Sequence, residues 1–259
     1  MPFVEADGAS IYYEAFGAGP AVAFAHGAGG NAASWWQQVP VFSARYRMIV
    51  FDHRLYGRSR CTPENFDRAK FGADLMAILD AEGIDRTAIV CQSMGGWTGL
   101  RAALEYPDRV ACLVLSNTSG GIYTPQVDEH LKAARQRFAA EGFGNVALHS
   151  DFIERSPGMA FLYAQISSLN AQLTPEVREK ISGRDNPVGV AALSGLQVPT
   201  LLITSENDVV FPPAAIREVA ALVPGAELVE LPAAGHSPYF ETPDAFNRTV
   251  GDFLQKHIG

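Results

Sequence analysis

The chain has 259 residues, 47% of them hydrophobic, and a formal net charge of -8 at pH 7. This length is sufficient to bury a large core in one α/β domain, with or without an insertion. The acidic balance argues against a nucleic-acid partner. We find no apolar run long enough to cross a membrane and no leader-like N-terminus, so we expect a cytoplasmic protein without membrane contact.

Three cysteines are present, Cys61, Cys91 and Cys112. Their spacing is neither that of a redox pair nor that of a metal site, so we expect free thiols. The chain has no H-E-x-x-H or Cys/His cluster, and no G-x-G-x-x-G or Gly-Lys-Ser/Thr phosphate loop. We therefore expect neither a metal nor an organic cofactor.

Short apolar runs alternate with helical patterns along the chain. The first residues and residues 10–16 are expected to pair as a hairpin through Asp7-Gly8. Further strands are expected at residues 21–26, 48–52, 87–92, 110–116, 200–204 and 227–231. Most of these are continuously apolar, which is expected when helices cover both faces of a parallel sheet.

Helices are predicted between these strands, at residues 67–82, 93–106, 212–222 and 243–258. The first of them ends at Gly83, a suitable C-cap residue. The alternation predicts an α/β fold, with a doubly wound, mostly parallel eight-stranded sheet.

Residues 121–196 contain helical patterns but no convincing strand. The clearest helix is at 126–141, with weaker ones at 157–169 and 175–181. We interpret this segment as a helical lid inserted before the acid-bearing strand, between core parts at 1–120 and 197–259. The alternative is a helical excursion with only a packing role.

Ser93 lies where a predicted strand meets a predicted helix, in Cys91-Gln92-Ser93-Met94-Gly95-Gly96. A sharp turn at this point exposes the central side chain above the sheet edge, and it needs small neighbours. Gly95 and Gly96 are small, but Cys91 stands where glycine is usual. We predict that Ser93 is a catalytic nucleophile; the alternative is a simple N-cap serine.

A serine hydroxyl needs a base to make it nucleophilic. Of the six histidines, His236 follows the last predicted strand in a Gly-His-Ser-Pro loop, and we predict that it is the base. Asp208, in the loop after residues 200–204, is the predicted acid, and Glu206 is its competitor. The loop after the preceding strand contains Asn117 but no carboxylate.

The backbone N–H groups of Ala28 and Met94 are the predicted oxyanion donors. Met94 lies in the first turn of the predicted helix 93–106, and Ala28 lies in the loop His26-Gly27-Ala28-Gly29-Gly30 after a strand. A glycine-rich turn without chemistry is the alternative for this loop.

Together these segments resemble the α/β-hydrolase fold superfamily. The likeness covers nearly the whole chain and includes the H-G-A-G-G loop, the Gln92-Ser93-Met94-Gly95-Gly96 turn, Asp208 and Gly235-His236-Ser237-Pro238. The resemblance implies a small esterase, enol-lactonase or carbon–carbon bond hydrolase with the order Ser, Asp, His. Carbon–carbon hydrolases often have Asn before the serine and proline in the H-G-x-G-P-G loop; here Gln92 and Gly30 stand at these positions.

We therefore expect an enzyme that cleaves a small, largely apolar carboxylic ester or lactone through an acyl-enzyme on Ser93. The alternatives are a carbon–carbon bond hydrolase of a meta-cleavage-type diketone, and a ligand receptor on a hydrolase fold. A homodimer is compatible with the sequence. The candidate substrate-binding residues are Gly27, Trp35, Trp97, Phe138, Phe161 and Tyr163.

Overall fold

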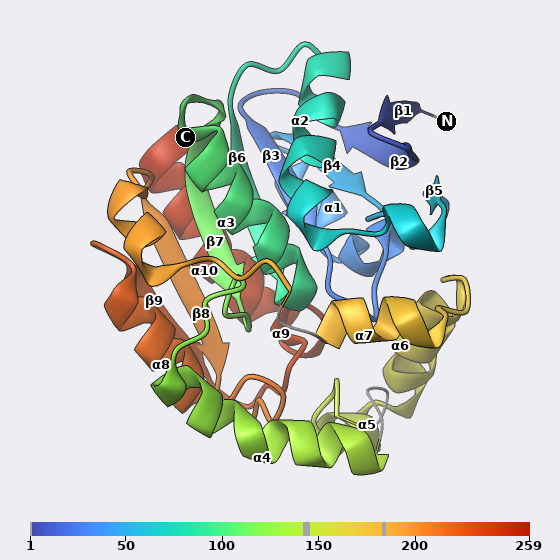
Figure 1. The fold of residues 1–259 in the computed structure, drawn as a ribbon, viewed down its shortest axis with the longest axis vertical. Coiled ribbons are helices and arrows are strands. Elements are labelled where there is room, and N and C mark those ends of the chain that lie inside the picture. The colour runs from blue at the N-terminus through green and yellow to red at the C-terminus, as the bar shows by residue number, and fades with distance from the viewer. Residues whose placement is uncertain (1, 142–145, 183–184) are drawn as a thin grey trace.

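A computed structural model describes residues 2–141, 146–182 and 185–259 (Figure 1). Eight strands lie side by side in the order β1-β2-β4-β3-β6-β7-β8-β9, and a ninth, β5, pairs with β2. The strands are β1 Phe3–Ala6, β2 Ala9–Phe16, β3 Ala21–Ala25, β4 Arg47–Phe51, β5 Arg60–Cys61, β6 Thr87–Gln92, β7 Val110–Ser116, β8 Thr200–Ser205 and β9 Glu227–Leu231.

The sheet is parallel along β4-β3-β6-β7-β8-β9, and the antiparallel pairs are β1 with β2, β2 with β4 and β2 with β5. This confirms the predicted mostly parallel, doubly wound α/β fold with an antiparallel hairpin at its start. The two-residue strand β5 was not predicted, because a run this short shows no periodicity.

Ten α-helices lie in the described part of the chain. They are α1 Val39–Phe42, α2 Phe71–Ala81, α3 Gly96–Glu105, α4 Pro125–Glu141, α5 Ser150–Arg155, α6 Pro157–Ser168, α7 Pro175–Ser182, α8 Pro213–Leu222, α9 Pro238–Glu241 and α10 Pro243–Ile258. The short helices α1, α5 and α9 were not predicted. The helix expected at 67–82 begins as a 3₁₀ turn, Arg68–Lys70, before α2.

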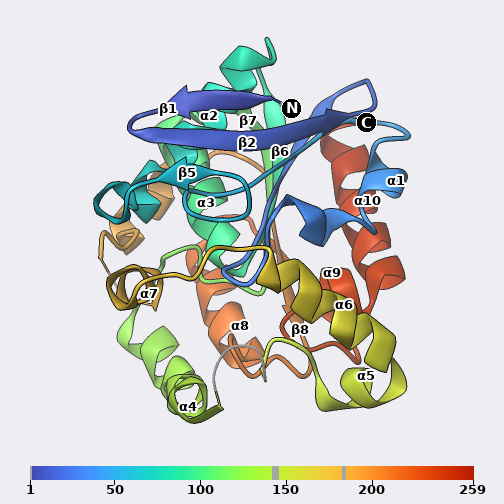
Figure 2. The same ribbon diagram turned by 90° about the vertical axis from the view of Figure 1, so that its right-hand side faces the viewer.

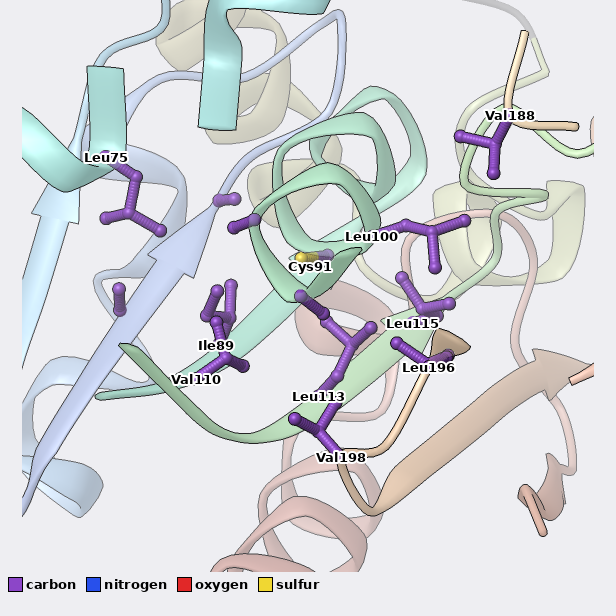
Figure 3. Close-up of a cluster of buried hydrophobic side chains, with 14 of the residues drawn as sticks. Leu75, Ile89, Cys91, Leu100, Val110, Leu113, Leu115, Val188, Leu196 and Val198 are labelled. Atoms are coloured by element: carbon purple, nitrogen blue, oxygen red, sulfur yellow. The ribbon is translucent and has the colours of Figure 1, made fainter. Parts of the chain in front are cut away.

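Two hydrophobic clusters cover the two faces of the sheet. Side chains from α2, α3 and α8 pack on one face, and those from α1, α9 and α10 pack on the other. Consecutive residues of β6 alternate between them: Ile89 and Cys91 belong to the first cluster, and Ala88 and Val90 to the second. Figure 3 shows Ile89 and Cys91 in the first cluster, beside Leu100 and Leu113. Burial on both faces explains why β6 is continuously apolar.

Helices α4 to α7 all lie between β7 and β8 in the sequence, and they gather at one end of the molecule (Figures 1 and 2). The two chain termini lie toward the opposite end in both views. Across the described ranges, none of the helices combines the length and apolarity that crossing a bilayer requires.

Candidate active site

The turn from β6 into α3 presents Ser93. Its φ is +50°, in the left-handed region that costs energy for a residue with a side chain. A Cβ added to Gly95 would lie 2.1 Å from the Ala25 carbonyl oxygen, so the turn presses against the end of β3. The strained conformation places the Ser93 side chain above the carboxyl end of the sheet.

Cys91 is accommodated by a glycine on the following helix. A Cβ added to Gly99 would lie only 2.3 Å from the Cys91 Sγ, so the thiol occupies space that a side chain at Gly99 would need. Burial also raises the pKa of the Cys91 thiol well above its usual range, which keeps it protonated and unreactive. Cys91 stands where glycine is usual on the strand, and Gly99 on α3 leaves the space that the cysteine side chain needs.

Ser93, His236 and Asp208 form a chain of hydrogen bonds. His236 Nε2 lies 2.9 Å from the Ser93 Oγ, and His236 Nδ1 lies 3.0 Å from the Asp208 Oδ2. The His236 and Asp208 side chains are completely buried. Since the carboxylate accepts the Nδ1 proton, Nε2 is left with its lone pair toward the Ser93 hydroxyl.

The Asp208 carboxylate is held by three other donors. Its Oδ1 accepts from the backbone N–H groups of Val210 and Phe211, at 2.7 and 3.0 Å. Its Oδ2 also accepts from the Asn117 Nδ2 at 2.8 Å. The competitor Glu206 instead accepts from the Ala233 N–H at 3.1 Å, on the exposed side of the loop.

A buried carboxylate shapes the histidine loop. Glu241 of α9 accepts the backbone N–H groups of His149, Gly235 and Ser237 at 2.9, 3.1 and 3.0 Å. Burial raises the pKa of Glu241, and these three bonds oppose the increase. Two of the three donors flank His236, so Glu241 fixes the backbone on both sides of the imidazole.

The glycine-rich loop after β3 lies directly against the serine turn. A Cβ added to Gly27 would lie 2.1 Å from the Gln92 Oε1 and 3.1 Å from the Ser93 Cβ. The Gln92 Nε2 in turn donates to the His236 carbonyl oxygen at 2.9 Å. The predicted oxyanion loop, the serine turn and the histidine loop therefore meet around Gln92.

His26 orients the same loop as a neutral ring. Its Nε2 accepts the His53 backbone N–H at 3.0 Å, so Nδ1 holds the proton and donates to the Gly27 carbonyl oxygen at 2.8 Å. Burial lowers the pKa of His26 to about 4. The predicted oxyanion loop is therefore organised by a hydrogen-bond pattern that depends on one tautomer of His26.

A pocket of about 550 Å³ opens beside Ser93. Ala28 and Met94 are both in its wall, and Met94 is the second residue of the 3₁₀ turn Ser93–Gly95, where N–H groups lack helical partners. The pocket is lined by Ala28, Arg68, Ser93, Met94, Trp97, Thr118, Tyr123, Leu131, Ala134, Arg135, Ala139, Ile181, Val210 and Phe211.

Only some of the predicted substrate-binding residues lie at the pocket beside Ser93. Trp97 lines this pocket, and Gly27 lies behind it, against Ser93. Trp35 is instead a core residue: it is fully buried on the α10 face and packs on Phe24 and Tyr239, with ring centroids 5.1 and 4.8 Å apart.

Two of the three aromatic residues predicted within residues 121–196, Phe161 and Tyr163, do not line the described pocket either. Phe161 on α6 is 66% exposed. The Tyr163 hydroxyl lies 3.1 Å from the Ser237 Oγ, and its ring packs on Phe240, so it supports the histidine loop. The Phe138 side chain lies outside the described residues.

Several residues at the site were missed by sequence reasoning. Arg68, Tyr123 and Phe211 line the pocket, and Asn117 contacts Asp208. Asn170, after α6, donates to the carbonyl oxygens of Gly29 and Gly30 at 3.4 and 3.1 Å. Only Asn117 had a signal, because it directly follows a strand whose end faces the site.

Over residues 2–141, 146–182 and 185–259, no three His, Cys, Asp or Glu side chains converge as metal ligands would. The described polar groups at the site are instead arranged around a serine hydroxyl.

The chain is similar in sequence and in fold to known proteins. The profile of the family described as alpha/beta hydrolase fold matches residues 20–243. A putative carbamate hydrolase RutD from Caulobacter sp. is 30% identical, over 94% of this chain and 95% of its own. The solved enol-lactonase from Burkholderia xenovorans is 26% identical, covers 98% of this chain and 100% of its own, and has a TM-score of 0.81. Est816, described as an N-acyl homoserine lactone degrading enzyme, is 27% identical over 97% of this chain and 100% of its own, with a TM-score of 0.83.

Proposed function

Because the chain belongs to the alpha/beta hydrolase fold family, we propose that it is a serine hydrolase that cleaves a carboxylic ester or lactone. The observation that supports this most is the buried Ser93–His236–Asp208 chain, with 2.9 and 3.0 Å contacts, beside a 550 Å³ pocket. The Ser93 side chain is in the pocket wall, so a bound carbonyl carbon could reach its hydroxyl.

In the proposed reaction, the Ser93 oxygen attacks the substrate carbonyl carbon while His236 Nε2 accepts its proton. The tetrahedral intermediate collapses as His236 gives that proton to the leaving alkoxide. A water molecule, deprotonated by His236, then attacks the acyl-enzyme and releases the acid. Asp208 stabilises the imidazolium that forms in both steps.

The developing oxyanion is assigned to the backbone N–H groups of Met94 and Ala28. Both residues are in the pocket wall next to Ser93. Preorganised donors of this kind are worth about 3–4 kcal/mol each in comparable enzymes. The close packing of Gly27 on Gln92 supports this role, because it fixes how far the loop lies from the nucleophile.

We also propose that residues 121–196 act as a lid on the core formed by residues 1–120 and 197–259. Leu131, Ala134 and Ala139 of α4 and Ile181 of α7 form part of the pocket wall that contains Ser93. A substrate would thus lie between the sheet edge and these helices, which gives the segment more than a packing role.

The descriptions of similar proteins support the proposal that this chain cleaves an ester or lactone bond. Two of the similar solved structures are described as an enol-lactonase and as an N-acyl homoserine lactone degrading enzyme, and a similar sequence as a putative carbamate hydrolase. All three descriptions name a carbonyl compound, a lactone or a carbamate, and the proposed mechanism begins with attack on a carbonyl carbon.

The deciding experiment is a panel of p-nitrophenyl esters, γ- and δ-lactones and a meta-cleavage dienone, assayed on wild type and on Ser93→Ala. Ester or lactone turnover that Ser93→Ala lowers by at least about 10⁴-fold is expected. A fluorophosphonate probe should label wild type and leave the variant unlabelled. Dienone turnover without ester turnover would point instead to carbon–carbon cleavage, and absence of labelling in folded wild type would point to a receptor.

A further inference from the structure

A buried cation shares the pocket wall with Ser93. Arg68, in the 3₁₀ turn Arg68–Lys70, is 4% exposed. Its guanidinium carbon lies 4.0 Å from the Trp97 ring centroid, and its Nη1 donates to the Ile181 carbonyl oxygen at 2.9 Å. All three residues line the pocket that contains Ser93.

Arg68 interacts with polar and charged groups besides Ile181. The pKa of Arg68 is lowered, mainly by burial and also by the nearby Arg101, while Tyr123 and Asp185 act in the opposite direction. Arginine nevertheless stays protonated in proteins. The pocket therefore holds a permanent positive charge that a nearby anion would stabilise further.

A second arginine lines the same pocket from the lid. Arg135 of α4 is half exposed, and its Nη2 lies 3.2 Å from the Asp128 Oδ1. Among the described lining residues there are two arginines and no carboxylate. The remaining wall is mostly apolar, so the pocket combines a surface for a carbon chain with a positively charged region.

We propose that the substrate has an anionic group, a carboxylate, which Arg68 binds while Ser93 attacks the ester or lactone carbonyl. This inference rests on the proposed function and narrows its substrate from a largely apolar ester to one that also bears a carboxylate. A planar guanidinium with several N–H donors matches a carboxylate, and Arg135 adds positive charge. Leu131, Val210 and Phe211 contact the carbon chain between the two groups.

The test compares two matched pairs of substrates, because the carboxylate can lie on either side of the scissile bond. One pair is mono-p-nitrophenyl glutarate and p-nitrophenyl hexanoate, and the other is 4-butyryloxybenzoate and phenyl butyrate. In at least one pair, kcat/KM for the anionic substrate should exceed that for the neutral one by about tenfold or more.

Arg68→Met should lower this anionic-to-neutral ratio by about tenfold to a hundredfold, mainly through KM for the anionic substrate. Arg68→Lys should restore part of the ratio, because it keeps the charge without the planar fork. Arg45→Met removes an exposed arginine that bonds Gln255, so it should leave the ratio unchanged. A wild-type preference for the neutral member of both pairs, or a ratio that folded Arg68→Met leaves unchanged, would overturn the proposal.

A binding measurement separates this inference from the proposed function. Monomethyl glutarate should bind Ser93→Ala at least about tenfold more tightly than dimethyl glutarate does, and Arg68→Met in that background should abolish the difference. If wild type hydrolyses no ester or lactone while this difference persists, the proposed chemistry fails and the anion site stands. If esters are hydrolysed but the difference is absent, only the anion site fails.

Discussion

The Asn117 side-chain amide donates a hydrogen bond to the Asp208 carboxylate, with 2.8 Å between Nδ2 and Oδ2. The same Oδ2 faces the His236 Nδ1 at 3.0 Å, so the amide and the imidazole share one oxygen. Asn117 follows β7, and its Oδ1 accepts from the Ser116 hydroxyl at 2.7 Å, which fixes the direction of the amide. A carboxylate at position 117 would thus start close to the imidazole.

This geometry predicts that the carboxylate partner of His236 can be moved from position 208, after β8, to position 117, after β7. Asp208→Asn should lower kcat by up to about 10⁴-fold, as loss of the triad acid does in serine proteases. The double variant Asn117→Asp/Asp208→Asn should recover at least about tenfold of that loss, measured as kcat on p-nitrophenyl butyrate. Asn117→Ala/Asp208→Asn is the matched control and should recover nothing. Equal rates for the two double variants would contradict the prediction that a carboxylate at position 117 can replace Asp208.

Gly27→Ala should damage the oxyanion loop. The added Cβ would lie 2.1 Å from the Gln92 Oε1, so either the loop or the Gln92 side chain must move. If the loop moves, one oxyanion donor is lost, and we expect kcat to fall by about 10²-fold with little change in KM. Gly251→Ala on α10 is the control, since nothing lies within 4 Å of its new Cβ. That control should keep full kcat, and an unchanged kcat in folded Gly27→Ala would count against the assigned oxyanion loop.

Asn170 should couple the proposed lid to the proposed oxyanion loop. Besides donating to Gly29 and Gly30, its Oδ1 accepts from the Gly57 N–H at 2.9 Å and from the Asn31 Nδ2 at 3.2 Å. Asn170→Ala removes all these bonds, so we expect kcat to fall by about tenfold with KM changed much less. The exposed Ser168→Ala, on the same helix end, is the control. Loss of thermal stability with kcat intact would show that Asn170 only anchors the lid.

Stability should fall as the pH is lowered from about 6.5 toward 4. Burial lowers the pKa of His26 from 6.5 to about 4, so in this window the unfolded chain binds a proton that the folded chain excludes. The His26 contribution, about 3 kcal/mol, is complete above the unfolded pKa and is lost on acidification through the folded pKa. Burial also lowers the pKa of His53, which adds an effect of the same sign.

Urea unfolding at pH 7 and pH 5 measures this effect. Wild type should lose more stability over this range than His26→Asn, whose side chain does not titrate. His130→Asn on α4 is the control and should behave as wild type. A His26→Asn variant that is folded and as acid-sensitive as wild type would show that His26 is not a source of the dependence.

The sequence alone determined the order of the longer strands and helices, the position of Ser93 at a strand–helix junction and the loops that contain Asp208 and His236. These features depend on local information: apolar runs, glycine and proline positions, and the residue at the end of each strand. Asp208 was preferred to Glu206 because the acid must reach the histidine from the loop rather than from the strand end. In the structure, the Asp208 carboxylate contacts the His236 imidazole, whereas the Glu206 carboxylate accepts the Ala233 N–H on the exposed side of the loop.

Only the tertiary structure decided which side chains surround Ser93. Trp35 and Phe161 were predicted from residue type, but one packs in the core and the other faces outward. Arg68 and Asn170 had no local signal, because each reaches the site through the packing of segments far apart in sequence. Strand ends and turns are encoded over a few neighbouring residues, whereas the wall of a pocket depends on how distant helices pack against the sheet edge.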